Sequence, residues 1–334
     1  MGAQGHANLR CQAPVFVVGC PRSGTTLLYH MLLSAGNFAV YRAESQVFNI
    51  LEPGFGDLKK SRHRRAMLTA WYNSPLFTKT GLAKEDVDET VMRNCRNGGD
   101  FLRTVMEAVA RKQNVQRWAD CTPEHLLYLR RIKETIPNAL IIHVVRDGRD
   151  VSLSLEKQGW IRPFKWDRDA GLAVAALYWS WIVRRGHALG PQLGPDYLEV
   201  QYENLVQYPA ATLTKISAFV EQPLDYEQIQ KVGIGSVSKP NTSFKSDASE
   251  QDFQPVSRWK SLMSDEQQAL VHTLVGDTLE ELGYKTNHQV SPPPYRKPLE
   301  RMRSVYQSYF NTKFLLKSKT ALGRALVSRD LSWT

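Results

Sequence analysis

The chain has 334 residues, of which 42% are hydrophobic, and a formal net charge of +10. This length supports one large domain or two small ones, and the positive charge favours an anionic partner such as a nucleotide, an anionic lipid or a sulfated glycan. No apolar run approaches the ~18 residues of a membrane span, and the four cysteines form no C-x-x-C pair that would indicate a zinc site. The first residues lack the apolar core of a signal peptide, so we expect a soluble cytoplasmic protein.

The first predicted elements are a strand and a helix that enclose a short loop. PVFVVG (14–19) is a nearly continuous apolar run, which is typical of a strand buried on both faces of a parallel sheet. TTLLYHMLLSAG predicts a helix that ends at Gly36. Residues 57–113 follow with mostly helical periodicity. Two breaks in that periodicity are expected, near Ser74-Pro75 and Gly98-Gly99.

Strands and helices alternate through the middle of the chain. RWADCTP (117–123) predicts a short strand and a helix that starts near Pro123, and ALIIHVV (139–145) is the clearest buried strand. The next predicted elements are a helix over 167–188, a strand over 196–205 and a helix over 208–220. This alternation predicts an α/β domain with a parallel sheet. Ligands of such sheets bind at the carboxyl ends of the strands.

The last third of the chain combines a long loop, a helix and a basic tail. Residues 233–258 are polar and predict a loop, which is a candidate lid because structureless loops of this length are usually functional or disordered. Residues 258–284 predict one helix, with a capping box at Ser264–Gln267. We therefore predict one domain over 1–290, followed by a Pro-rich linker and a basic helical tail over 291–334.

The tail carries nine Lys and Arg residues against two acids from Tyr295 onward. Leu299, Met302, Tyr306 and Tyr309 share one face of the predicted helix. Two interpretations remain open at this point. The helix is docked on the domain or solvated, or it contacts a membrane surface or a second copy of the chain through its basic side.

The stretch VVGCPRSGTT looks like a phosphate-binding loop that lacks its lysine. Gly19 and Gly24 have the spacing of G-x-x-x-x-G-K-[ST], in which backbone N–H groups wrap phosphate oxygens. Thr25 stands where the lysine is expected, while Thr26 keeps the hydroxyl position. A strand, a glycine loop and a helix N-terminus make an anion site by backbone geometry alone. The missing lysine counts against a P-loop kinase that uses ATP and Mg²⁺, which is the first alternative.

A second motif, Arg146-Asp147-Gly148-Arg149-Asp150, follows the strand over 139–145. An arginine at a strand end suits a phosphate better than a metal, because its planar fork pairs with two phosphate oxygens. Asp147 and Asp150 are candidate metal ligands, but they also fit the roles of helix N-cap and first-turn acid. Ser154 lies eight residues after Arg146 and is the natural hydroxyl to share this second phosphate site.

Together the two motifs resemble the sulfotransferases that use 3′-phosphoadenosine 5′-phosphosulfate as donor. The 5′-phosphosulfate loop of that family reads P-[RK]-[ST]-G-T-[TS], like residues 21–26, and its 3′-phosphate element reads R-D-x-R-D-x-x-x-S, like residues 146–154. The resemblance continues at WADCTPEH, VQYENL and SRWKSLMSDEQ, and it spans residues 14–284 in the family's order. It implies a P-loop-like three-layer α/β fold, with a central parallel sheet flanked by helices, helical insertions and a C-terminal helical extension.

The resemblance also implies a reaction and a set of donor-binding residues. The sulfuryl group moves to a hydroxyl or amine of a small molecule, lipid or glycan without a metal, and 3′,5′-adenosine bisphosphate is left. Arg22 and the backbone N–H groups of the loop stabilise the charge that develops on the leaving phosphate oxygen. No nucleic-acid-binding module is evident. The residues expected to bind the donor are Arg22, Ser23, Gly24, Thr25, Thr26, Arg146, Ser154, Tyr202, Arg258 and Trp259.

Glu44 is the expected catalytic base. In the branch with the tyrosylprotein and some carbohydrate sulfotransferases, a Glu follows the loop, and Glu44 lies 22 positions after Arg22. It is the only acid among residues 1–51. The alternative is that Glu44 merely pairs with Arg42 or another nearby cation. The cytosolic branch uses a His instead, for which His125 is the candidate.

Cys121 is a departure from the family pattern. Many relatives have a Lys at this position that stabilises the sulfuryl group in transfer, and a thiol supplies no such charge. Lys239, Lys245 or Lys260 would have to substitute, or catalysis is weakened. The second alternative is therefore a non-catalytic relative that binds a nucleotide or a partner. Cys121 is not expected to act as a nucleophile, because no paired His is evident.

Overall fold

A four-stranded parallel sheet forms the centre of the chain, in the order β2-β1-β3-β4. The computed structural model describes residues 10–239, 254–286, 296–320, 322–327 and 331. Its strands are β1 (Val15–Gly19), β2 (Ala119–Asp120), β3 (Leu140–Val145) and β4 (Tyr197–Gln201). Val15 pairs with Leu140 and Ile141 pairs with Tyr197, so the carboxyl ends of β1, β3 and β4 lie at one edge of the sheet.

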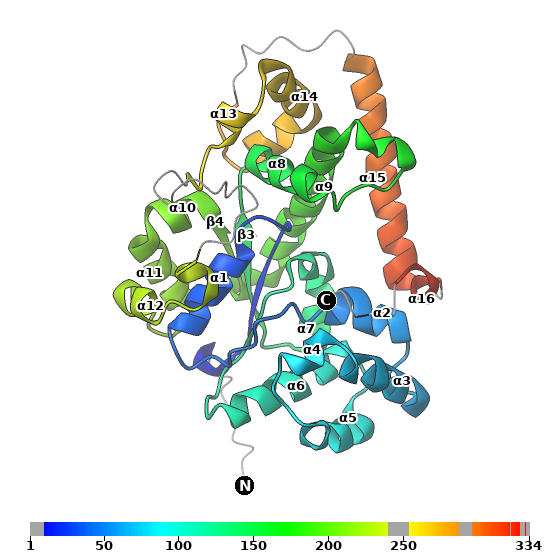
Figure 1. The fold of residues 1–334 in the computed structure, drawn as a ribbon, viewed down its shortest axis with the longest axis vertical. Helices are drawn as coiled ribbons and strands as arrows, with labels where there is room; N and C mark the ends of the chain where they lie inside the picture. The colour runs from blue at the N-terminus through cyan, green and yellow to red at the C-terminus, as the bar shows by residue number, and fades with distance from the viewer. Residues whose placement is uncertain (1–9, 240–253, 287–295, 321, 328–330, 332–334) are drawn as a thin grey trace.

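Alternate strand residues face two hydrophobic clusters, one on each side of the sheet. Val15 and Val17 point to the cluster that includes α1 (Thr25–Ser34), α11 (Pro209–Val220) and α12 (Tyr226–Val232). Phe16 and Val18 point to the cluster that includes α6 (Gly98–Lys112) and α9 (Gly171–Leu189). Figure 1 shows α1, α11 and α12 to the left of the sheet and α9 to its right. The predicted three-layer α/β fold is confirmed.

The segment between α1 and β2 is a helical insertion, as its periodicity predicts. Its helices are α2 (Glu52–Phe55), α3 (Ser61–Tyr72), α4 (Pro75–Thr78), α5 (Asp88–Asn94) and α6, preceded by a π-turn at Val47–Leu51. The break at Ser74-Pro75 is confirmed, because Pro75 begins α4. Gly98 begins α6, and Asn97 caps that helix by accepting a hydrogen bond from the N–H of Asp100 at 2.9 Å.

The segment 117–123 follows its prediction. It contains the short strand β2, and a 3₁₀ turn begins at Pro123 and leads into α7 (Leu129–Thr135). The predicted strand over 196–205 is shorter than expected, because the chain leaves the sheet after Gln201, where α10 (Tyr202–Gln207) begins. The carboxylate of Glu203 in α10 accepts the N–H of Asp147 at 3.0 Å and so ties this end of β4 to the end of β3.

Residues 258–284 form two helices, so the prediction of one helix is wrong. α13 (Trp259–Leu262) ends at Met263, and α14 (Asp265–Glu281) starts anew at Ser264. Ser264 has an extended backbone, and its side chain and that of Gln267 cap each other's N–H groups. The predicted capping box is therefore present, and it begins a helix instead of lying inside one. Of the predicted loop over 233–258, residues 240–253 lie outside the described residues.

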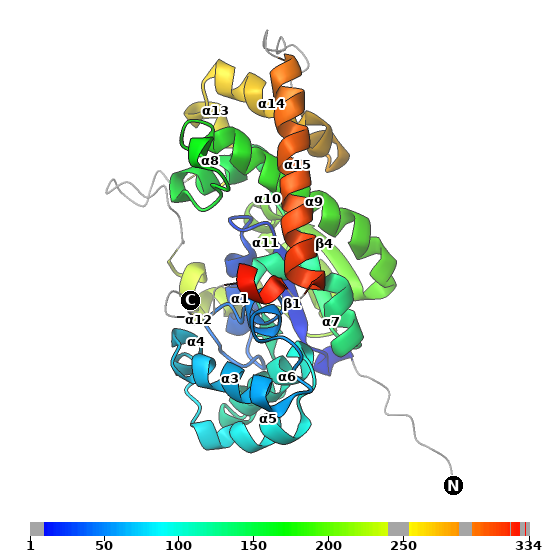
Figure 2. The ribbon, with the colours of Figure 1, turned by 90° about the vertical axis from the view of Figure 1, so that its right-hand side faces the viewer.

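The tail forms a long helix that packs on the domain. α15 (Arg296–Lys319) contacts α9 and α14 and is followed by the short α16 (Gly323–Leu326). Leu299, Tyr306 and Phe310 bury one face of α15, and Figure 2 shows this helix running along the molecule in front of α9. The docked interpretation is confirmed, and contact of the basic side with a membrane or a second copy stays a prediction. Among the described residues, no helix is both long enough and apolar enough to span a membrane.

Candidate active site

The loop between β1 and α1 has the backbone of an anion site. Arg22 and Gly24 have left-handed φ values of 73° and 92°, and α1 begins at Thr25 with its first N–H groups turned toward the loop. A Cβ added to Gly24 would lie 2.2 Å from a ring carbon of Tyr202. Glycine is therefore required twice here, for its conformation and for the close approach between the loop and the end of β4.

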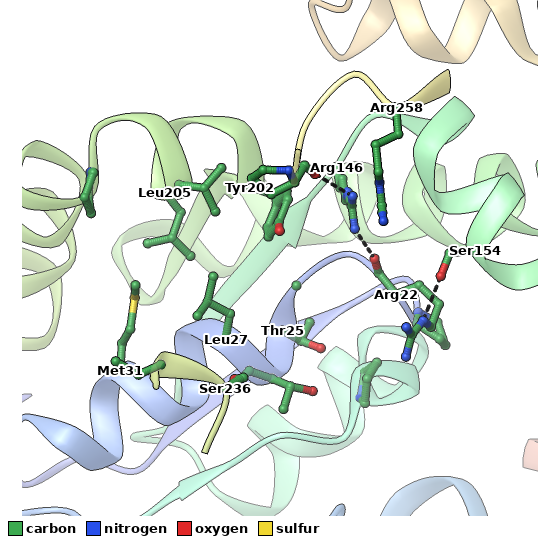
Figure 3. Close-up of a pocket in the computed structure, with 18 of the residues that line it drawn as sticks. Arg22, Thr25, Leu27, Met31, Arg146, Ser154, Tyr202, Leu205, Ser236 and Arg258 are labelled. Atoms are coloured by element: carbon green, nitrogen blue, oxygen red, sulfur yellow. Dashed lines mark hydrogen bonds between the residues drawn. The ribbon is translucent and has the colours of Figure 1, made fainter. Parts of the chain in front are cut away.

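A cavity of about 310 Å³ opens over this loop at the carboxyl edge of the sheet. One end carries the three guanidinium groups of Arg22, Arg146 and Arg258, and the other end is apolar (Figure 3). Thr25, Thr26, Glu44, Ser154 and Tyr202 also line it. The apolar end is lined by Leu27, Met31, Leu205, Val206, Pro209 and Tyr226. The cavity is thus divided into a cationic half and an apolar half.

Arg146 is held at the centre of the cationic half. Its two terminal nitrogens donate to the carbonyl oxygens of Arg22 at 3.0 Å and Pro255 at 2.8 Å. Its guanidinium also lies 4.3 Å from the centre of the Tyr202 ring. The Nε atom is buried and has no partner in the part of the chain that the structure describes. A buried donor without an acceptor is costly, so this nitrogen fits an anionic ligand.

The three arginines of the cavity repel one another. Burial lowers the pKa of Arg22, and the nearby charge of Arg146 lowers it further. Burial and the same neighbour also lower the pKa of Arg258. The guanidinium of Arg146 lies 3.8 Å from the carboxylate of Asp150. Such a cluster is unfavourable without more negative charge, which a phosphate-bearing ligand supplies.

Arg22 belongs to the loop over 21–26 and Ser154 ends the second motif, and their side chains are in direct contact. The Nε of Arg22 donates to the Ser154 hydroxyl at 2.9 Å. On the other side, the Arg22 guanidinium lies 5.7 Å from the ring centre of Trp160. Trp160 is 56% exposed and lines the cavity. The two predicted phosphate motifs therefore form one continuous surface.

Glu44 lines the same cavity, and the pKa of its carboxyl is raised into the neutral range. Solvent reaches the side chain, but the surrounding protein raises its pKa to about 7, first by desolvation and then through the charges of Glu124 and Asp120. Gln46 donates to its Oε2 at 2.6 Å, which fixes the carboxylate and opposes part of that rise. The charge of Lys79, a residue that was not predicted from the sequence, also lowers the pKa of Glu44. A carboxyl with a pKa near 7 is suited to general-base catalysis.

His125 and Cys121 lie behind the cavity and have structural contacts. His125 is fully buried, with Nδ1 at 2.9 Å from Asp120 and with Nε2 accepting the N–H of Phe48 at 3.2 Å. Both ring nitrogens are therefore used, so His125 is not placed to act as a base. Cys121 is buried against the side chains of Thr25 and Thr26, and burial raises the pKa of its thiol well above the ordinary value. The thiol is neutral at physiological pH.

Some predicted residues do not face the cavity. The ring of Trp259 lies 3.7 Å from the Arg149 guanidinium, and the backbone N–H of Trp259 donates to Asp150 at 2.9 Å, so this residue supports the Arg146 motif from outside the cavity lining. The Ser23 side chain is fully buried beneath the loop, which leaves its backbone as the predicted contact. Lys239 and Lys260 are exposed and are not among the described residues that line the cavity. Lys245 lies outside the described residues.

The two acids of the second motif, Asp147 and Asp150, form hydrogen bonds and ion pairs within the protein. Asp147 caps α8 (Gly148–Gln158) by accepting the N–H of Arg149 at 2.9 Å, and it forms an ion pair with the side chain of the same arginine at 2.7 Å. Asp150 accepts the N–H of Trp259. No group of three or more His, Cys, Asp or Glu side chains arranged to hold a metal occurs in the described ranges.

The match to a known protein family includes both phosphate motifs. A protein-family model described as "Sulfotransferase family" matches residues 14–226. The chain is 25% identical over 305 residues to protein-tyrosine sulfotransferase A of Caenorhabditis elegans, covering 86% of this chain and 70% of that protein. It is 24% identical over 302 residues to the protein-tyrosine sulfotransferase of Drosophila melanogaster, covering 85% of this chain and 54% of that protein. The chain thus spans about half the length of the fly protein.

A solved structure supports the fold. The sulfotransferase domain from the Synechococcus PCC 7002 olefin synthase superposes with a TM-score of 0.54 at 19% identity. The superposition covers 82% of this chain and 96% of that domain.

Proposed function

The chain belongs to the sulfotransferase family, and from this premise we propose that it moves the sulfuryl group of 3′-phosphoadenosine 5′-phosphosulfate to an acceptor hydroxyl, with Glu44 as base. The observation that carries the proposal is the divided cavity. Its cationic half suits two separate phosphates, and its apolar half suits a purine ring.

Each part of the donor has a matching surface. The loop over 21–26 and the N-terminus of α1 would hold the 5′-phosphosulfate. Arg146, Ser154 and Arg258 would hold the 3′-phosphate, with the unpartnered Nε of Arg146 as one donor. The adenine would lie against the apolar end beside Leu27.

The reaction follows from the residues at the cationic end. The donor carries a good leaving group, the phosphate of 3′,5′-adenosine bisphosphate. Glu44 would accept the proton of the acceptor hydroxyl, for which a pKa of about 7 gives both an ionised fraction and enough basicity. Arg22 and the loop N–H groups would stabilise the charge that grows on the leaving oxygen. No step in this scheme needs a metal.

The acceptor class is indicated by the relatives. Both curated relatives are named protein-tyrosine sulfotransferases, and their acceptor is the phenolic hydroxyl of tyrosine. We propose that the acceptor of this chain also carries a phenolic hydroxyl. The acceptor classes expected from the sequence are a small molecule, a lipid or a glycan. The P-loop kinase alternative is not supported, since the family match covers the loop that a kinase would use for ATP.

Calorimetric titration tests the proposal. We expect 3′,5′-adenosine bisphosphate to bind tightly with or without Mg²⁺, and ATP to bind weakly under both conditions. The Arg22→Ala variant should bind the bisphosphate less tightly and should also lose turnover by ~10²-fold or more. ATP binding that requires Mg²⁺, with weak binding of the bisphosphate, would contradict the proposed donor.

A further inference from the structure

A second cavity, of about 260 Å³, adjoins the donor cavity. The two share Trp160, and the 3₁₀ turn after β2 contributes Pro123 to the first and Glu124 to the second. The charge of Glu124 is also a main cause of the raised pKa of Glu44. The second cavity, hereafter the aromatic cavity, therefore adjoins, at Trp160 and at the turn after β2, the donor cavity that Glu44 lines.

The walls of the aromatic cavity come from three segments that are far apart in the sequence. They are the turn over 123–128, the connection over 160–163 with α9, and the last half of α15. Phe310 packs edge-on against Tyr178 at 5.5 Å between ring centres, and Phe314 packs in the same way against Tyr128 at 5.5 Å. The aromatic residues that line the cavity are Tyr128, Trp160, Tyr178, Trp181, Tyr309, Phe310 and Phe314. A preformed cavity of this kind suits one flat aromatic ring.

Positive charges outnumber negative charges in the lining of the aromatic cavity. Glu124 is the one acid in the lining, and its two oxygens already accept the Tyr178 hydroxyl at 2.8 Å and the Asn49 amide at 3.2 Å. Lys313 and Lys317 face it from α15, and Arg162 adds a third cation to the lining from the connection over 160–163. Within the described chain neither lysine lies within 4.0 Å of a carboxylate. Burial lowers the pKa of Lys317, which shows that part of its solvation is lost. An anionic group on the ligand would complement these three cations.

We propose that the aromatic cavity is the acceptor site and that it takes a phenol bearing an anionic substituent, such as a carboxylate. The inference rests on the proposed function. The ring lies among the aromatic walls, the anionic group meets Lys313 and Lys317, and the hydroxyl passes Trp160 to reach Glu44. In the transfer the acceptor oxygen bonds to sulfur, the bond from sulfur to the 5′-phosphate oxygen breaks, and the phenol proton goes to Glu44. The products are an aryl sulfate and 3′,5′-adenosine bisphosphate.

The tail supplies much of this site. The family model ends at residue 226, and α15 lies well beyond it. Since α15 supplies Tyr309, Phe310, Phe314 and both lysines, the acceptor preference would depend on a segment outside the family model. The same helix docks through Leu299 and Tyr306, so its position over the cavity is fixed by packing.

Two matched probes test the charge preference. The probes are 3-(4-hydroxyphenyl)propanoate and its neutral methyl ester, with the donor held saturating and kcat/KM measured for each. The wild type should prefer the propanoate by about tenfold, because three cations line the cavity and Lys317 among them is partly desolvated. In the Lys313→Gln, Lys317→Gln double variant most of this preference should be lost, since Arg162 is the cation that remains in the described lining. Lys297→Gln, an exposed change at the start of the same helix, should keep the preference.

A binding measurement separates this inference from the proposed function. Titrating the propanoate into the complex with 3′,5′-adenosine bisphosphate should quench the fluorescence of Trp160 and Trp181 in a saturable way. Phe314→Ala should weaken that binding about tenfold while the bisphosphate binds as before. If the bisphosphate binds but the propanoate gives no saturable quenching, or if the wild type treats both probes alike, the acceptor site is wrong. If the bisphosphate itself fails to bind, the proposed function is wrong.

Discussion

The proposed base makes a sharp prediction about pH, because the pKa of Glu44 is raised from an ordinary value of 4.5 to about 7. A base works only when ionised, so turnover should be lost as the pH falls through the pKa of the folded protein. With that pKa, about one tenth of Glu44 is ionised at pH 6 and about nine tenths at pH 8. Saturated turnover should therefore rise about tenfold between these pH values, whereas a pKa of 4.5 would leave it almost flat.

The assay measures release of 3′,5′-adenosine bisphosphate at saturating donor and acceptor across pH 5.5 to 8.5. Glu44→Gln should lower turnover by ~10²-fold or more, leave bisphosphate binding intact, and remove the step near pH 7. The donor's 3′-phosphate also titrates, near pH 6 by analogy with other phosphate esters, but that step would persist in Glu44→Gln. Glu266→Gln, an exposed acid in the first turn of α14, is the matched control and should keep both rate and profile. A wild-type profile that is flat above pH 6, or a Glu44→Gln variant with normal turnover, would refute the reasoning.

Two further predictions concern the phosphate motifs. Arg146→Ala should weaken 3′,5′-adenosine bisphosphate about 10- to 100-fold, from the loss of charge-assisted hydrogen bonds, and should affect adenosine 5′-phosphate much less; equal losses in calorimetry would place Arg146 away from the 3′-phosphate. Gly24→Ala and Gly36→Ala are a matched pair, since both glycines have left-handed φ (92° and 77°) but only the Gly24 position lacks room for a Cβ. Gly36→Ala should cost about 1 kcal/mol of unfolding free energy from backbone strain alone, and Gly24→Ala should cost clearly more and weaken bisphosphate binding; similar thermal shifts for both would mean that Tyr202 moves aside.

The residues expected to bind the donor could be predicted because most of them lie in two short continuous segments of the sequence. The loop before α1 needs only a buried strand, two spaced glycines and a helix start, and all three are local properties. The Arg146 motif is equally local, since Asp147 caps the helix that the same motif begins. Parallel strands bring the ends of such segments to one edge, and this explains why Arg22 and Ser154, which were assigned to two separate phosphate sites, meet at 2.9 Å.

Predictions failed where the outcome depended on a partner from elsewhere in the chain. β4 ends at Gln201, and just beyond it Glu203 accepts the backbone N–H of Asp147, a contact that the pattern of VQYENL does not show. Trp259 stays a prediction as a donor contact; its ring lies against Arg149, and it is not among the described residues that line the cavity. Trp160, which lines both cavities, was missed because it follows the end of α8 without a motif; its only local signal is a large apolar side chain beside Gly159.

The tail shows why an acceptor is harder to predict than a donor. Its apolar face was evident from the spacing of Leu299, Met302 and Tyr306, and docking against α9 explains that face fully. The spacing does not reveal that docking through these residues carries Phe314 and Lys317, further along the same helix, to the side of Glu124. Any chain that keeps the two phosphate motifs can keep the donor, because each motif carries its own backbone geometry. Acceptor choice instead depends on how α15 packs across the domain, so a change in the docked face alone would move both lysines and alter the substrate without touching the cavity that binds the donor.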